Sequence, residues 1–413
     1  MTLRLLLLFV FSALQCSVFA QEFKIIGYLP YYRFDIIDQI DFKKITHLNL
    51  AFLNPDIDGN LTIGDRDIDP LIAHAKSINP GIEVFISLAG GGLTEESAQA
   101  YDKFMLPENR NEFAGLLVDY VIIHNLDGID VDLEWGHVNE YYSPFVLILS
   151  DSLKSHGKQL SAALPATYRY PEVSQEAMDA FDFVNLMAYD KTGPWRPNDP
   201  GPHSPRELAI QSIAYWRNQG LDNVRMTLGV PFYGYDFTDQ SNVTAFTFET
   251  MVNESEHYAY SDQVGEKYYN GIPTIQYKAH YAMNEVAGIM IWELGQDAFA
   301  NNNEYSLLSA IDFVVKTGNL PITGLDINLN SDENRIKIFP NPFQETLTIS
   351  SREVHEMVIV HLFDLQGREH FREEFLLLNN EKSLDFHRLV SGLYVLKVEF
   401  GEVCITKKII KSN

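Results

Sequence analysis

Cysteine is scarce in this chain of 413 residues, which contains only Cys16 and Cys404. Cys16 lies in an N-terminal segment that we expect to be removed, and a single remaining cysteine cannot form an intramolecular disulfide. We interpret Cys404 as a small apolar residue in a strand. The fold must therefore rely on its hydrophobic core, which a chain of this length can bury.

Positive charge is also in short supply. Lysine and arginine number 31 against 56 aspartate and glutamate residues, so the net formal charge is −25. Such a surface repels phosphate backbones, and we expect no nucleic-acid partner. An uncharged polysaccharide would meet no such barrier. Hydrophobic residues at 46% and charged residues at 21% are typical of a globular protein.

Long apolar runs are missing beyond the first twenty residues, so the sequence predicts no membrane span. Those twenty residues combine Arg4, an apolar run over residues 5–10 and the small residue Ala20. This pattern predicts a secretory signal peptide, residues 1–20, cleaved after Ala20. A lipoprotein signal on Cys16 is disfavoured because Gln15 stands where a small residue is expected. We therefore expect a secreted protein.

The rest of the chain divides into two regions of different pattern. In residues 21–319, short apolar runs alternate with helical patterns, whereas residues 335–413 carry short strands separated by turn signals. Residues 320–334 are rich in Asp and Asn and are interpreted as a linker. The C-terminal pattern predicts a small all-β sandwich.

Eight near-continuous apolar runs in the first region predict parallel strands buried on both faces. They are Lys24–Leu29, Thr46–Phe52, Ile82–Leu88, Gly128–Glu134, Gln159–Leu164, Phe183–Ala188, Arg225–Pro231 and Gly288–Trp292. Helical patterns lie between and after them, for example at Arg110–His124, Tyr141–His156, Pro205–Gln219 and Tyr305–Lys316. This alternation predicts an α/β fold, a (β/α)8 TIM barrel. A doubly wound sheet is the alternative, but no glycine-rich phosphate loop follows the first strand.

The fourth predicted strand carries a row of acids. Side chains alternate along a strand, so Asp130, Asp132 and Glu134 share one face and the apolar residues between them share the other. In a barrel the apolar set would face the helices. The carboxylates would then point inward, with Glu134 at the C-terminal mouth, where such enzymes keep their active sites. Crowded, buried carboxyl groups have raised pKa values, as a general acid needs.

Two other interpretations of this acidic row remain. It could be a solvated edge, although the intervening apolar residues favour burial. Three carboxylates could also bind a hard metal such as calcium, but such ligands usually come from a flexible loop. We expect catalysis and no metal.

The segment Asp127–Glu134 resembles the DGxDxDxE signature of family 18 glycoside hydrolases, the chitinases and their relatives. Residues 187–190, Met-Ala-Tyr-Asp, resemble the MxYD segment of that family, and residues 229–234 resemble the segment after its seventh strand. Trp292 resembles the tryptophan that floors the sugar site. One segment departs from the pattern, because Ala89 stands where the first glycine of Ser-x-Gly-Gly is expected.

The resemblance implies a substrate-assisted, retaining mechanism without an enzyme nucleophile. Glu134 would protonate the glycosidic oxygen, Asp132 would orient the substrate acetamido group, and Asp130 would hold or share a proton with Asp132. Tyr189 would donate to the acetamido oxygen, and Asp190 would bond to the sugar or to Tyr189. No metal or organic cofactor enters this scheme.

Aromatic residues at strand ends can stack on the apolar faces of sugar rings. Trp292 is the predicted floor of the site, and further candidates for substrate contact are Tyr28, Trp135, Trp195 and Tyr233. Phe52 and Met187 are expected to pack in the core, with Met187 also kept among the substrate-binding candidates as part of the MxYD segment. The insertion between Phe237 and Ile272 is short, which predicts a shallow, open groove.

Three short pieces of the tail resemble the C-terminal sorting domain of Bacteroidetes type IX secretion: Ile338–Pro342, Phe363–Arg368 and Leu389–Val395. The resemblance implies that secretion machinery in the outer membrane is a partner and that the protein is released or attached to the cell surface. A carbohydrate-binding module is the competing interpretation, disfavoured because no tryptophan follows Trp292.

The leading hypothesis is a hydrolase of β-1,4-linked N-acetylglucosamine polymers, expected to act as a monomer and in endo mode. Alternatives with the same chemistry are an endo-β-N-acetylglucosaminidase on N-glycans and a hydrolase of peptidoglycan glycan strands. A non-catalytic lectin or an adhesin would be expected to lack Glu134, which is present here.

Overall fold

A computed structural model describes residues 23–320, 337–350, 357–364, 368–376, 381–400 and 403–412. The predicted signal peptide at 1–20 lies outside the described residues, as does the predicted linker except for its first residue. No helix in the described ranges is both long and apolar enough to cross a membrane.

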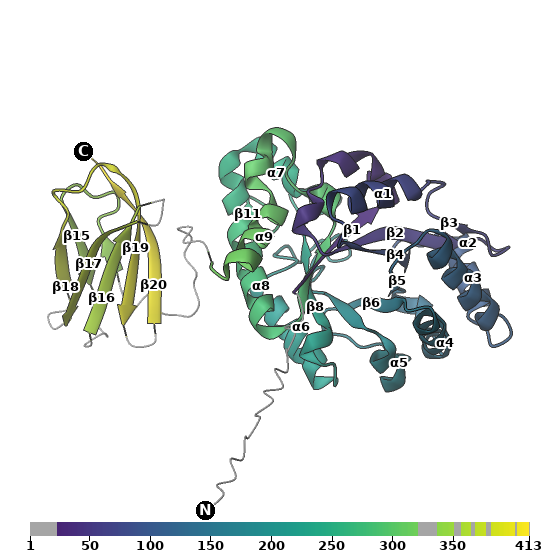
Figure 1. The fold of residues 1–413 in the computed structure, drawn as a ribbon. Coiled ribbons are helices and arrows are strands. Elements are labelled where there is room, and N and C mark those ends of the chain that lie inside the picture. The colour runs from purple at the N-terminus through teal and green to yellow at the C-terminus, as the bar shows by residue number, and fades with distance from the viewer. Residues whose placement is uncertain are drawn as a thin grey trace, which may run out of the picture.

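Eight parallel strands close into a barrel, as the sequence predicts (Figure 1). They are β1 (Lys24–Pro30), β2 (His47–Pro55), β4 (Glu83–Ala89), β5 (Gly128–Asp132), β6 (Gln159–Pro165), β7 (Phe183–Met187), β8 (Met226–Pro231) and β13 (Gly288–Trp292). The strands pair in the order β1-β13-β8-β7-β6-β5-β4-β2, and β2 pairs back with β1. A short strand, β3 (Leu61–Thr62), extends β2. Because all eight strands run in parallel, their carboxyl ends meet at one mouth.

Helices follow the strands and cover the outside of the barrel (Figure 1). They are α1 (Asp69–Ile78), α2 (Glu95–Phe104), α3 (Arg110–Ile123), α4 (Tyr142–Ser155), α5 (Gln175–Ala180), α6 (Arg206–Asn218), α8 (Ile272–Glu285) and α9 (Leu307–Thr317). Outward strand residues such as Ile129, Val131 and Leu133 are fully buried against them. The predicted apolar face of β5 is therefore the face that meets the helices.

The barrel interior, in contrast, contains a polar layer. Its members are fully buried side chains from six strands, namely Asn49, Ser87, Asp130, Ser161, Asn185 and Thr227. All of them except Asn49 are hydrogen-bonded to another member of the layer, as buried polar groups generally require. This layer lies below the mouth and supports the residues that reach it.

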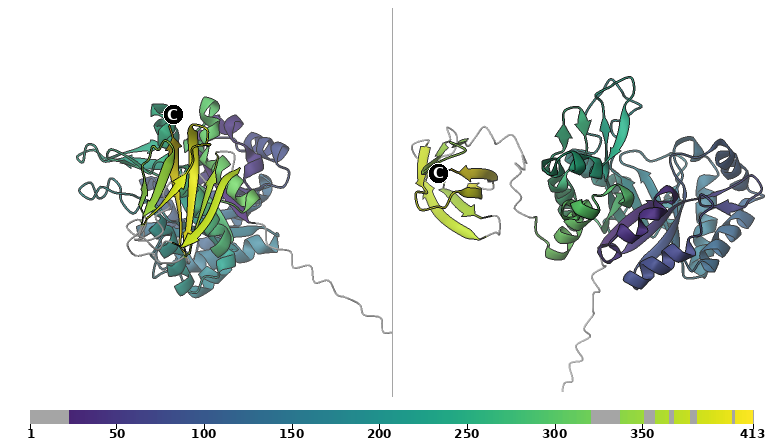
Figure 2. Two further views of the ribbon diagram at one scale, coloured as in Figure 1. Left: turned by 90° about the vertical axis from the view of Figure 1, so that its left-hand side faces the viewer. Right: turned by 90° about the horizontal axis from the view of Figure 1, so that it is seen from above.

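The segment after β8 forms an antiparallel sheet in the order β10-β9-β12-β11. Its strands are β9 (Tyr233–Asp236), β10 (Thr244–Thr247), β11 (Gln263–Val264) and β12 (Lys267–Tyr268), with α7 (Phe248–Glu254) between them. It stands out from the barrel wall in the right-hand view of Figure 2. The insertion is therefore a small α+β unit that begins at Tyr233, four residues before the predicted start. The depth of the groove beside it stays a prediction.

The tail is a sandwich of two antiparallel sheets, which confirms the predicted fold class. One sheet contains β14 (Lys337–Phe339), β15 (Thr346–Ser350) and β18 (Glu381–Asp385); the other contains β17 (Glu369–Leu376), β16 (Met357–Phe363), β19 (Gly392–Phe400) and β20 (Val403–Lys411). They share a core that includes Leu347, Val360 and Leu396. The apolar pattern of the tail predicts strands at Arg335–Phe339, Thr346–Ser350, Met357–Phe363, Gly392–Val398 and Val403–Ile409. Two strands, β17 and β18, are not among them. β17 is an edge strand with no buried residue, so it lacks the apolar alternation that identifies a strand.

Helix α9 is held by a buried carboxylate. Asp297 accepts hydrogen bonds from the backbone N–H groups of Leu307 (2.7 Å) and Leu308 (3.0 Å) at the start of α9, and from the Ser306 hydroxyl (2.7 Å). It also accepts one from the Ala298 N–H at 2.8 Å. These bonds satisfy donors that the first turn of a helix leaves open.

We predict that Asp297→Ala lowers the free energy of unfolding of the barrel by about 3 kcal/mol, because it leaves several buried donors unpaired. All four tryptophans lie between residues 135 and 292, so urea unfolding followed by tryptophan fluorescence reports on the barrel alone. The control is Asp312→Asn, which removes an ion pair with the exposed Lys316 on the same helix and should cost about 1 kcal/mol or less. Equal losses in the two variants would contradict the assigned role of Asp297.

Candidate active site

Asp130 is the centre of the polar layer and is 0% exposed. Its carboxylate accepts hydrogen bonds from Tyr28 Oη (2.7 Å), Ser87 Oγ (2.7 Å), Ser161 Oγ (2.6 Å) and Asn185 Nδ2 (3.1 Å). Burial raises the pKa of Asp130, and these hydrogen bonds act in the opposite direction. Donors from four other strands therefore hold this side chain in one position.

Asp132 is buried on the same face but has few partners. Its Oδ1 atom is one of the few buried side-chain oxygens of the described residues that has no hydrogen-bond partner. Burial raises the pKa of Asp132 well above its usual value, and the charges of Glu134 and Asp130 raise it further. An unpartnered buried oxygen is costly, so the site is incomplete without a donor at this position.

Glu134 lies two residues beyond the end of β5, which stops at Asp132, two residues earlier than predicted. Its backbone stays extended, with φ −125° and ψ 153°, so its side chain remains on the face of Asp130 and Asp132. Burial raises the pKa of Glu134 to about 7, and the charge of Asp190 adds to this shift. A hydrogen bond from Trp135 partly opposes it. Glu134 can thus hold a proton near neutral pH, as a general acid must.

The loop after β4 borders the Glu134 carboxylate. A Cβ atom on Gly91 would lie 2.8 Å from Glu134 Oε1, so only glycine fits there without displacing the acid. Ala89, where the resemblance leads one to expect glycine, adopts a left-handed φ of 70°. Gly90 is also left-handed, and a Cβ there would lie 2.4 Å from the Phe52 ring. The backbone conformation thus persists despite the alanine.

Asp190 follows β7 and faces the sheet that begins at Tyr233. Its Oδ1 accepts hydrogen bonds from Tyr233 Oη at 2.5 Å and Tyr235 Oη at 3.1 Å. The ring of Tyr189 lies 6.2 Å from that of Tyr233, and the Tyr189 hydroxyl lies 3.8 Å from Met290 Sδ. The sequence analysis did not identify Tyr235, although its alternation with Tyr233 on one short strand places both on the same face.

Trp292 lies at the end of β13 and packs between two rings. Tyr28 lies edge-on at 5.6 Å, and Phe52 is stacked at 5.6 Å and 25°. Tyr28, predicted to contact substrate, is only 1% exposed, with its hydroxyl on Asp130. Tyr28 therefore supports Asp130 through a hydrogen bond and Trp292 through a ring contact. Phe52 and Met187, which were predicted to pack in the core, are partly buried and pack against this cluster.

Two tryptophans predicted to bind substrate are the most exposed aromatic residues near these acids. Trp135 is 65% exposed and lies edge-on to Tyr170 at 6.3 Å. Trp195 is 54% exposed and lies edge-on to Tyr235 at 5.7 Å. The exposed Tyr168, which the sequence analysis missed, contacts Tyr170 at 5.3 Å. These rings can offer free faces to a ligand.

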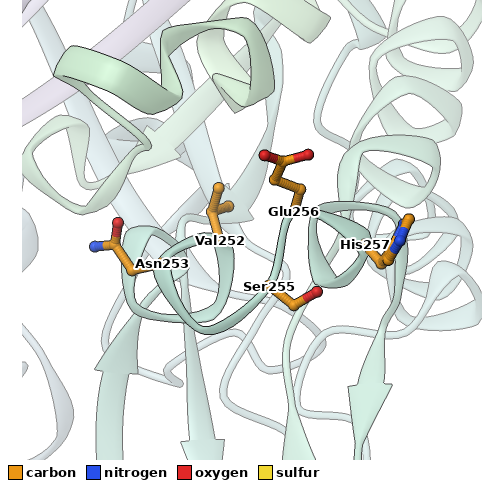
Figure 3. A pocket seen from close by; sticks show the side chains of 5 residues that line it. All are labelled: Val252, Asn253, Ser255, Glu256 and His257. Carbon is orange, nitrogen blue, oxygen red and sulfur yellow. The ribbon is translucent and has the colours of Figure 1, made fainter.

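Other places on the described residues offer less chemistry. A hollow of about 390 Å³ where α7 ends is lined by Val252, Asn253, Ser255, Glu256 and His257 (Figure 3). A single carboxylate there has no acidic neighbour in the lining. The described ranges contain no group of three or more His, Cys, Asp and Glu side chains arranged to hold a metal ion.

A (β/α)8 barrel with a row of inward carboxylates and a raised-pKa glutamate at its mouth defines the class of barrel glycoside hydrolases. The family model of glycosyl hydrolases family 18 matches residues 24–297. The chain belongs to this family. A model of the secretion system C-terminal sorting domain matches residues 337–412. The exact boundaries at 319 and 335 stay predictions.

Solved structures agree with this assignment. The family 18 chitinase ChiB from the chitin utilization locus of Flavobacterium johnsoniae is 45% identical, with a TM-score of 0.70 over 72% of this chain and 94% of that chain. A chitinase from Bacteroides thetaiotaomicron is 26% identical, with a TM-score of 0.62 over 70% of this chain and 96% of that chain.

Curated relatives include much longer proteins. The Drosophila melanogaster protein "Probable chitinase 10" is 25% identical over 73% of this chain. The chain spans only 16% of the length of that relative.

We predict that Gly91→Ala lowers the turnover of a soluble chitin oligosaccharide by about tenfold to a hundredfold, because the new methyl group displaces the Glu134 carboxylate. Gly92→Ala is the matched control, since a Cβ there meets no atom within 4 Å. Both variants should unfold at the same temperature as the parent protein. Equal turnover in the two variants would show that Glu134 tolerates the methyl group.

Proposed function

We propose that this protein hydrolyses β-1,4-linked N-acetylglucosamine polymers, chitin or its oligosaccharides, with retention and with help from the substrate. The observation that carries the proposal is Asp132, a buried carboxyl group with an unpartnered oxygen between Asp130 and Glu134. An acetamido N–H supplies the missing donor. The chitinase names of the related structures support the same substrate class.

In this scheme Glu134 donates its proton to the glycosidic oxygen as the bond to the sugar breaks. The carbonyl oxygen of the substrate acetamido group attacks the anomeric carbon from the other side, so the enzyme supplies no nucleophile. Asp132 accepts the acetamido N–H and stabilises the positive charge of the oxazolinium ion. Deprotonated Glu134 then takes a proton from the water that opens this ring.

Two further side chains act on the same sugar. Tyr189 donates its hydroxyl to the acetamido oxygen, and burial raises its pKa, which keeps that proton in place. Asp130 is fully buried, so it cannot reach the sugar. It acts on Asp132 instead, by sharing a proton with it and through its charge. Asp190 lies at the edge of the site. Its charge acts on Glu134, and its carboxylate bonds to the sugar hydroxyls.

Aromatic rings bind the neutral polymer by stacking. We assign the floor to Trp292 and the two outer contacts to Trp135 and Trp195, whose faces are exposed. Tyr233 is buried, and its hydroxyl donates to Asp190. Its part in substrate binding is therefore limited to the edge of the surface that Trp292 forms. Met187 lines the edge of the same cluster.

The sorting domain indicates delivery of the enzyme to the cell surface or beyond. We propose that the type IX secretion machinery reads residues 337–412 after cleavage of the signal peptide at 1–20. An external hydrolase then meets polymers too large to enter the cell. The proposed endo mode and monomeric state fit this task.

The decisive variant is Glu134→Gln, which removes the proton donor and keeps the shape. We predict that it lowers hydrolysis of N-acetyl-chitooligosaccharides by about a thousandfold or more, because a positioned general acid contributes on this order. The matched control is Glu140→Gln, an exposed residue six positions away that should keep full activity. Products are resolved by mass and anomer.

Rapid release of β-anomers by the parent protein supports the retaining mechanism, and product lengths separate endo from exo action. If the parent protein leaves these oligomers intact, the chitinase proposal fails, and N-glycans and peptidoglycan strands are the next substrates. Binding without turnover on all three would indicate a lectin.

We also predict the pH dependence. Glu134 must be protonated to act, and its pKa is raised to about 7. Activity should therefore fall as pH rises through about 7, rather than near the ordinary glutamate pKa of about 4.3. The kcat/KM profile on a soluble oligosaccharide measures this alkaline limb, and a limb below pH 5 would contradict the burial of Glu134.

A further inference from the structure

His203 is a buried residue that the mechanism above does not use. It lies at the end of the loop between β7 and α6 and is 0% exposed. Its Nε2 atom lies 3.1 Å from the carbonyl oxygen of Tyr233, and its Nδ1 atom lies 3.4 Å from Asp190 Oδ1. Its ring also contacts those of Tyr233 and Tyr235 at 4.9 and 5.1 Å.

The hydrogen bonds of this ring determine how many protons it holds. A carbonyl oxygen can only accept, so Nε2 must carry a hydrogen. In a neutral ring Nδ1 is then a bare lone pair, and it faces a carboxylate oxygen. Nδ1 has no hydrogen-bond partner of its own within the described ranges. The His203 ring is fully buried, whereas the Asp190 side chain is 40% exposed. A lone pair that faces a carboxylate oxygen is repelled by it, and one proton between the two atoms turns that repulsion into attraction.

The other groups around Asp190 do not supply this proton. Tyr233 and Tyr235 already donate to the same Oδ1, and burial raises the pKa of both phenols, so they stay neutral. Lys278 on α8 is also buried, but its Nζ atom donates to Ser204 and Asn270 and makes no bond to Asp190 among the described residues. In the part of the chain that is described, His203 is the basic side chain found against Asp190, with Nδ1 at 3.4 Å from Oδ1.

The backbone of His203 is anchored on both sides. Its carbonyl accepts from the Lys191 N–H at 2.9 Å. The next residue, Ser204, donates its hydroxyl to the Ala188 carbonyl at 2.6 Å, and Lys278 Nζ donates to both Ser204 oxygens at 2.6 Å. These bonds fix the backbone of His203, and the ring itself is held by the hydrogen bond of Nε2 to the Tyr233 carbonyl and by its contacts with the Tyr233 and Tyr235 rings.

We propose that His203 is a positioning residue that shares one proton with Asp190 and so reduces the negative potential that Asp190 presents to Glu134. The charge count does not depend on where the proton sits. An imidazolium beside a carboxylate and a neutral imidazole beside a carboxylic acid both sum to zero. Without the histidine, Asp190 alone contributes a full negative charge. The effect on catalysis, though not the shared proton, rests on the proposed function.

The shared proton is tested without substrate by NMR of protein labelled with nitrogen-15 in histidine. We expect the Nδ1 of His203 at pH 7 to show a strongly downfield proton resonance, assigned by its loss in His203→Gln. In Asp190→Asn this resonance should disappear, which provides a second assignment if the glutamine variant does not fold. A bare Nδ1 without a downfield proton in the parent protein would overturn the proposal.

The effect on Glu134 is tested by pH profiles. His203→Gln can still donate to the Tyr233 carbonyl but brings no proton to Asp190. We predict that the alkaline limb of kcat/KM moves to higher pH by about half a unit or more, because an uncancelled negative charge holds the Glu134 proton more tightly. The matched control, Tyr235→Phe, removes a donor to the same Oδ1 without removing the shared proton, and its limb should stay in place.

A double variant separates positioning from simple structural damage. In the Asp190→Asn background, adding His203→Gln should produce no further shift of the limb, because the histidine acts through Asp190. A uniform loss of activity with an unmoved limb in His203→Gln, or an equal shift in both backgrounds, would overturn this part of the proposal. If the parent protein hydrolyses none of the oligosaccharides, the proposed function fails, and the NMR result still decides the shared proton.

Discussion

The removal of carboxylates from water on the inward face of β5 is the constraint on which the rest of this site depends. A fully buried aspartate is tolerated only when hydrogen bonds replace its water shell. Asp130 obtains four of them from Tyr28, Ser87, Ser161 and Asn185, which belong to four different strands. A closed barrel is suited to this task, because inward side chains of many strands converge on one axis.

The three acids on and just after β5 differ in environment more than in chemistry, and this difference assigns their roles. Asp130 has four donors, Asp132 has an unpartnered oxygen, and Glu134 lies at the mouth with a pKa raised to about 7. The innermost acid therefore has the most hydrogen-bond donors, and access increases toward the mouth. The innermost acid fixes the geometry, and the outermost one keeps a proton that it can give away.

The period-two alternation in Asp127–Glu134 was enough to predict which residues face inward, because that rule is local. The eight apolar strands were predictable for the same reason. The burial of Tyr28 was not, since it depends on which layer of the barrel the strand end occupies. The pairing of His203 with Asp190 joins two ends of one irregular loop, and no periodic signal reports such contacts. β17 was missed because an edge strand without a buried face carries no apolar pattern.

The loop after β4 shows that the site, rather than local preference, sets the backbone there. A left-handed alanine costs about 1 kcal/mol, and Ala89 adopts that conformation in a sequence where glycine would be the easier choice. Asn54 holds it, by accepting from the Ala89 N–H at 3.1 Å and donating to its carbonyl at 3.4 Å. The Gly90 N–H bonds to the Asp132 carbonyl at 2.9 Å. This clamp brings Gly91 against Glu134, so the strain is retained where it positions the acid.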